Sequence, residues 1–219
     1  MAQSSSSSAA TTTPQFVGIN FSTFCSVMGR PLVMTGVFRE ILIRHFAHAD
    51  YIEEPDLKKL IWRENTSTGI KIESVHRWRP ELTEFRPAVM VKRNAYQNQR
   101  RGIGDRRQGP HTDQRGTDHY VTYWVGSHTM FCISRTGAHA ELLGSEVQHE
   151  LTEFGPAIAK SLNLLRFQAT QVGAVARLAE ARENWVVPVT VGYAYEQRWT
   201  LRQQAPRLKT VAMSLITDC

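Results

Sequence analysis

The feature that most constrains the fold is an apolar stripe between Gly137 and Leu165. Large apolar side chains recur there at steps of three and four residues, the spacing that places them on one face of a helix. Gly155-Pro156 interrupts the stripe. Because proline removes a backbone donor and clashes with the preceding turn, we expect a kink there, or a break with Pro156 at the first position of a second segment. The sequence therefore predicts a helix over 137–165 with a buried stripe formed by Leu143, Val147, Leu151, Phe154, Ile158 and Leu162.

The carboxylates of this segment lie largely away from the stripe. We interpret Glu141, Glu146, Glu150 and Glu153 as a solvated helix face. An acid/base pair would need two carboxylates in different environments, and the sequence does not distinguish one of these from another.

The rest of the chain divides into a tail, an arm and one domain. Residues 1–15 are rich in Ser, Thr and Ala, which predicts a flexible tail and not a secretory signal. Residues 16–34 are apolar but interrupted by glycine and proline, so we expect an extended arm that packs on its own domain or on a neighbouring subunit. The single domain spans 35–219. No apolar run approaches the ~18 to 20 residues needed to cross a bilayer, so no membrane association is expected.

The domain is predicted to be α+β, a mostly antiparallel sheet with two main helices packed on one face. Thr35 is a plausible N-cap of a helix that ends near His48. Gly126 is the expected site of a bulge or bend in a strand, and Pro188 indicates an edge position or a bulge. The apolar face of the last long strand exceeds what two helices cover, which predicts a second sheet face or a subunit interface. The expected strands are 70–75, 88–91, 119–134, 165–170, 185–201 and a short one within 208–216.

Residues 94–118 break all periodicity and predict a long loop. The net charge of the chain is +6, and this segment contributes to it through Arg100, Arg101, Arg106, Arg107 and Arg115. Three interpretations remain open: a solvated loop, contact with the phosphates of a nucleic acid without sequence readout, or contact with an acidic face of another subunit.

The sequence contains no recognisable catalytic or metal-binding constellation. His45 and His48 lie three residues apart without an accompanying HExxH pattern, and exposed or half-buried helix histidines are the favoured interpretation. The three cysteines are widely spaced and form no CxxC. We therefore expect no cofactor, no metal and no enzymatic activity. A hydrolase that uses the scattered histidines, which include His119, His128, His139 and His149, is the least favoured alternative.

Several stretches together resemble neck proteins of tailed bacteriophages, most closely the tail terminator, also called the tail completion protein. They are RPAVMVKRN at 86–94, YVTYWVGSHTMFCIS at 120–134, AELLGSEVQHELTEFGPAIAKSLNL at 140–164, LRFQATQVG at 165–173 and WVVPVTVGYAYEQRWTL at 185–201. The resemblance covers roughly 36 to 201 and carries over no catalytic residue.

The resemblance implies a helix-on-sheet subunit that assembles as a hexameric ring on the last ring of the tail tube. Such a ring ends tail polymerisation and joins the tail to the head-closure or connector protein, while DNA passes through the lumen. The expected partners are thus copies of the chain, the tail tube protein and the connector, with the tail sheath and non-specific DNA as further candidates. The expected location is the virion neck, after assembly in the host cytoplasm. The alternatives are another neck ring, such as a head-closure or adaptor protein, and a sequence-independent nucleic-acid-binding module.

Overall fold

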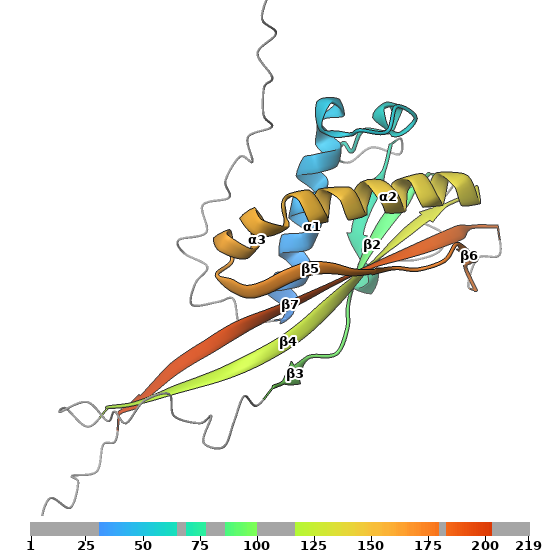
Figure 1. Cartoon of the computed structure of the whole chain (residues 1–219). Coiled ribbons are helices and arrows are strands. Elements are labelled where there is room, and N and C mark those ends of the chain that lie inside the picture. Colours follow the sequence, from blue (N-terminus) through green and yellow to red (C-terminus); the bar gives the residue numbers. More distant parts are fainter. Residues whose placement is uncertain (1–30, 65–68, 78–85, 100–116, 180–182, 203–219) are drawn as a thin grey trace, which may run out of the picture.

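In the part of the chain that the structure describes, three helices lie on one side of a strongly twisted sheet (Figure 1). The computed structural model describes residues 31–64, 69–77, 86–99, 117–179 and 183–202. The helices are α1 (Pro31–Ala47), α2 (Gly137–Glu153) and α3 (Gly155–Ser161). Short 3₁₀ turns occur at η2 (Ala49–Tyr51), η3 (Leu57–Lys59) and η4 (Val75–Arg77). The α+β class predicted from the sequence is confirmed.

Within the described residues the sheet has seven strands, and it is mostly antiparallel, as predicted. Its strand order is β1-β2-β4-β7-β5, with β3 paired to β4 and β6 paired to β7. Only the β1–β2 pair of the described strands is parallel. The strands are β1 (Lys71–Ser74), β2 (Ala88–Arg93), β3 (Gln97–Asn98), β4 (Thr117–Ser134), β5 (Leu164–Val172), β6 (Ala176–Arg177) and β7 (Trp185–Arg202). The final strand predicted within 208–216 lies outside the described residues.

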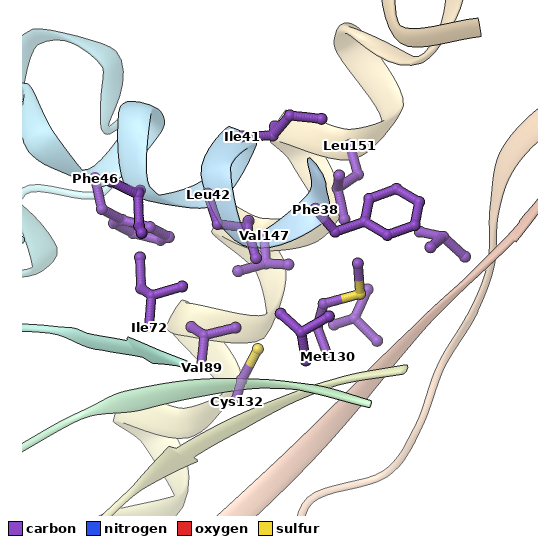
Figure 2. Close-up of a cluster of buried hydrophobic side chains, with 14 of the residues drawn as sticks. Phe38, Ile41, Leu42, Phe46, Ile72, Val89, Met130, Cys132, Val147 and Leu151 are labelled. Carbon is purple, nitrogen blue, oxygen red and sulfur yellow. The ribbon is translucent and has the colours of Figure 1, made fainter. Parts of the chain in front are cut away.

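The apolar stripe forms the centre of the core. Five of its six members are buried, and Phe154 is half-buried where α2 ends. Figure 2 shows Val147 and Leu151 of α2 beside Phe38 and Leu42 of α1, above side chains of the sheet. The expected interruption is present as a break, with Pro156 in the first turn of α3. The helical segment ends earlier than predicted, because Asn163 adopts a left-handed φ of 50° and β5 begins at Leu164.

The first helix begins before the position predicted from the sequence. Residues 31–34, assigned to the extended arm, form the first turn of α1. Thr35 is therefore not an N-cap. Its side chain lies buried inside the helix, with Oγ1 at 2.9 Å from Nε2 of His128. The Thr35 hydroxyl, predicted to cap the helix, instead forms a hydrogen bond with a buried histidine of the sheet.

The two longest strands contain the two residues for which local irregularity was predicted, Gly126 and Pro188. The prediction of a bulge or bend at Gly126 is wrong, and at Pro188 the edge position is wrong while the pairing register does shift there. Gly126 interrupts neither strand, since it pairs in regular register with Tyr193. Its lack of a side chain accommodates Tyr96, whose ring would lie 2.8 Å from an added Cβ. Pro188 lies in the interior strand β7, where its carbonyl accepts from Gly173 N on the side facing β5. In a strand the nitrogen of a residue points to the same side as its carbonyl, so the missing donor falls at the junction between β5 and β6.

The sheet face opposite the helices carries a smaller apolar cluster. Ala88, Met90, Ile133 and Val186 are buried there. Farther along the same face, Thr129 Oγ1 lies 3.1 Å from Thr190 Oγ1. No helix in the described part of the chain is long and apolar enough to span a membrane.

Candidate functional site

The predicted contact arginines lie between positions 100 and 116, outside the described residues: Arg100, Arg101, Arg106, Arg107 and Arg115. The residues on both sides of this segment belong to the sheet: β3 precedes it and pairs with β4, and β4 itself follows it. β3 pairs with Val125 and Trp124 of β4, and Gln99 N donates to the carbonyl of Tyr123 at 2.9 Å. The segment ends at Thr117, where β4 begins. The range 94–118 predicted for the loop is therefore too wide at both ends, because β3 forms within its first residues and β4 begins at Thr117.

A buried charged cluster joins the two long helices. His45, in the last turn of α1, is 5% exposed, and Glu146 and Glu150 of α2 are 4% and 6% exposed. Nε2 of His45 lies 2.8 Å from Oε1 of Glu146, and Nδ1 lies 2.8 Å from Oε2 of Glu150. The interpretation of these two glutamates as a solvated face is wrong, because α1 packs against that side of α2.

The geometry of this cluster determines the protonation of His45. A carboxylate only accepts hydrogen bonds, whereas a neutral imidazole has one donor and one acceptor nitrogen. Both ring nitrogens meet a carboxylate oxygen, so both must carry a proton. Burial alone lowers the pKa of His45, but the hydrogen bonds and charges of Glu146 and Glu150 outweigh it and raise the pKa to about 9.

One of these carboxylates, that of Glu146, also fixes the chain that follows α1. Glu146 accepts from the backbone N–H of Glu53 at 3.0 Å and from that of Glu54 at 3.3 Å. Burial raises the pKa of Glu146, but the bonds from His45 and these two amides lower it below its usual range. Glu146 therefore satisfies groups from α1 and from the turn at 53–54 at once.

A shallow depression of about 120 Å³ adjoins this cluster on the solvent side. His149, about half exposed, lies on its rim, with Nε2 at 3.3 Å from both Glu53 Oε1 and Glu153 Oε2. Both nitrogens of the buried His45 are engaged by carboxylates, so it offers no free lone pair to a substrate or a metal. Among the described residues, no group of three His, Cys, Asp or Glu side chains has the arrangement of a metal site.

A second buried polar cluster is a row of hydrogen-bonded side chains centred on His128 of β4, which is fully buried. Its Nε2 meets Thr35 of α1, and its Nδ1 lies 3.0 Å from the hydroxyl of Tyr193. That hydroxyl in turn bonds to the hydroxyl of Tyr96, beside β3. Burial and the nearby charge of Arg93 lower the pKa of His128 to about 4. This neutral histidine connects the first helix to the segment that leads into the arginine-rich region.

Sequence reasoning missed both histidine clusters for the same reason. His45 follows Ile41 and Leu42 at helical spacing, which is a signal of burial, and Glu146 and Glu150 each precede a stripe residue directly. His48, by contrast, lies just beyond α1 and is exposed, so the two histidines do not share a site. The pairing of His45 with α2 depends on how the helices cross.

Comparison with known proteins adds no family to these observations. No protein-family model matches the chain, and no curated protein matches it in sequence. The function proposed below accordingly rests on the fold, on the geometry of its strands and helices, and on the sequence patterns described above.

Proposed function

We propose that this chain is a structural virion protein of a tailed-phage neck, a tail terminator. In this role it forms a hexameric ring that caps the tail tube, ends tail polymerisation and joins the tail to the head connector, with DNA passing through the lumen. The proposal is supported by the agreement between the observed α+β subunit and the helix-on-sheet subunit that the resemblance implies. Another neck ring, such as a head-closure or adaptor protein, would use the same architecture.

The observation that carries the proposal is the length of β4 and β7. Each has 18 residues, and they pair along their whole length. β5 stops pairing with β7 at Tyr195, and β3 stops pairing with β4 at Trp124. Beyond these points the described sheet consists of two strands only, which project away from the helices (Figure 1). We define this projecting part, 117–123 with 196–202, as the ribbon.

An isolated two-stranded ribbon is at best marginally stable in water. Three strands with an apolar face, or packing against another element, are needed to stabilise it. In an assembled ring a neighbouring subunit supplies such a surface. The internal clusters are consistent with a structural role, because both buried histidines have their ring nitrogens occupied by side chains of the same chain.

The test is the oligomeric state of the full-length protein. Negative-stain imaging is expected to show rings, and light scattering is expected to give a mass near that of a hexamer. A stable monomer at high protein concentration would count heavily against the proposal. Rings that leave the length of assembled tail tubes unregulated would favour another neck position over the terminator.

A sequence-independent nucleic-acid-binding module is the second candidate, favoured by the segment 100–116. This segment contains five arginines against two aspartates, and it connects the end of β3, which pairs with β4, to the start of β4. Contacts with phosphates release counterions, so the affinity should fall steeply as salt rises. The salt dependence of binding to a mixed-sequence DNA duplex measures this directly.

Paired substitutions make that test specific. Arg100→Ala with Arg101→Ala, and Arg106→Ala with Arg107→Ala, should each weaken binding and reduce its salt dependence. The matched control is Lys58→Ala with Lys59→Ala, which removes the same amount of charge from the exposed turn η3, outside the segment 100–116. If the protein retains no DNA at low salt, the nucleic-acid candidate is wrong, whatever its oligomeric state.

A further inference from the structure

We propose that His45 is a proton-dependent latch. While its imidazole carries two protons, it holds the end of α1 and the backbone at Glu53 and Glu54 against α2. Loss of one proton opens this junction locally and leaves the sheet intact. The proposal is independent of the function proposed above.

The first argument is the arrangement of donors and acceptors. A neutral His45 could donate to Glu146 or to Glu150, but not to both. Its other nitrogen would then direct a lone pair at a carboxylate oxygen 2.8 Å away. All three side chains are buried, so water screens this repulsion poorly. The closed arrangement is therefore stable only with the doubly protonated ring.

The second argument concerns where the junction can open. The amides of Glu53 and Glu54 are held on α2 by the carboxylate of Glu146. The residues on either side, Ile52 and Leu57, are anchored differently, since both are buried in the apolar core. Apolar burial does not respond to a change in protonation. Opening therefore breaks the polar contacts of His45 and of the turn at Glu53 and Glu54 with α2, while the apolar anchors stay in place.

The sign of the pH dependence follows from the two states of His45. In the open junction the ring is expected to regain its ordinary pKa of 6.5, while the contacts of the closed junction raise the pKa to about 9. Below pH 6.5 both states are protonated, and the latch is at full strength. Between pH 6.5 and 9, opening releases one proton, so the opening constant rises about tenfold per pH unit. The total change is on the order of a hundredfold, and above this window it levels off.

Other titratable groups also face the junction. Glu146 and Glu150 contact His45 from α2. From the turn, Glu53 and Glu54 contact Glu146 through their backbone amides. His149 lies on the solvent side between Glu53 and Glu153, and it is the second imidazole at this turn. The control His149→Gln therefore separates the contribution of this side chain from that of His45.

Amide hydrogen exchange of the full-length protein tests the latch. After correction for intrinsic exchange rates, the protection of the Glu53 and Glu54 amides should fall about tenfold per pH unit between pH 6.5 and 9. These amides should also be less protected than those of β2 and β4 and insensitive to low denaturant, as expected of a local opening. If they show the same protection and denaturant sensitivity as β2 and β4, opening is global and the proposal is wrong.

Two variants complete the test. His45→Gln should leave the Glu53 and Glu54 amides weakly protected and independent of pH, whereas His149→Gln should retain the wild-type profile. A flat wild-type profile, or loss of the pH dependence in His149→Gln, would overturn the proposal. If His45→Gln does not fold, the ¹⁵N shifts of the His45 ring in the wild-type protein at neutral pH decide. Two protonated nitrogens support the latch, and a single protonated nitrogen excludes it.

Discussion

Nε2 of His45 lies 2.8 Å from Oε1 of Glu146, a contact between residues 101 positions apart in the chain. It joins the last turn of α1 to the middle of α2. Both side chains are almost fully buried, so the ion pair is shielded from water and salt. Buried ion pairs add little net stability compared with apolar packing of the same volume. Removal of one partner nevertheless destabilises the fold strongly, because the other charge is left buried without compensation.

Removal of one partner should therefore have a large effect. His45→Ala leaves Glu146 and Glu150 buried without their shared cation, and we expect the free energy of unfolding to fall by about 3–5 kcal/mol. Urea denaturation measures this change. The control is His149→Ala, which removes a half-exposed histidine from the same helix surface and should change stability by at most about 1 kcal/mol. Equal effects of the two substitutions would contradict the role assigned to burial.

Global stability should pass through a maximum near pH 6.5. His45 binds its proton more tightly in the folded state, so its contribution of about 3 kcal/mol is present below pH 6.5 and is lost between pH 6.5 and 9. His128 has the opposite sign, because the folded state disfavours its proton, and its contribution is lost as the pH falls from 6.5 to 4. Urea midpoints across this range measure the curve. In His45→Gln the alkaline limb should flatten while the acid limb remains.

Two helix glycines should respond in opposite directions to alanine. A Cβ at Gly36 in α1 meets no atom within 4 Å, so Gly36→Ala should stabilise the protein by about 0.5–1 kcal/mol through helix propensity. A Cβ at Gly144 in α2 would lie 2.8 Å from Cγ1 of Val187, and Gly144→Ala should destabilise it by about 1–3 kcal/mol. Thermal denaturation of both variants checks the pair. A stabilising Gly144→Ala would mean that α2 does not sit this close to β7.

The contact between Gly126 and Tyr96 should appear as coupling in a double-mutant cycle. Gly126→Ala alone places a Cβ 2.8 Å from the Tyr96 ring and should cost about 1–3 kcal/mol of unfolding free energy. When Tyr96→Ala is present, the ring is gone and the added cost of Gly126→Ala should shrink. Additive effects, measured by urea denaturation, would show that the two positions are not in contact.

The local patterns of the sequence were sufficient for most of the elements. The α2–α3 stripe and the alternation of apolar residues in β7 each specify one buried face, and those faces are buried in the structure. The helix also breaks at Gly155-Pro156, as the sequence predicts. Helix starts were less predictable, as Thr35 shows. A threonine before an apolar helix has the chemistry of a cap, and only the proximity of His128 reveals that its hydroxyl serves the core instead.

Strand irregularities also depended on neighbours that the sequence does not name. Gly126 resembled a bulge because glycine weakens a strand, but the structure shows a tyrosine ring against its backbone. Pro188 indicated an edge position or a bulge, and it lies in an interior strand at the point where the pairing partner changes from β5 to β6. In both cases the residue type correctly signals a missing group, which is the side chain at Gly126 and the backbone N–H at Pro188. The arrangement of the neighbouring strands determines what lies beside it.

The sequence by itself determined the α+β class, the faces of the helices and strands, and the core stripe, because the helical and extended periods repeat within a few residues. The tertiary structure decided which polar side chains are buried. Glu146 and Glu150 follow the same spacing whether they face water or a histidine on α1. Their environment depends on a contact between distant segments, since a carboxylate leaves water only when packing brings it a cation and hydrogen-bond donors.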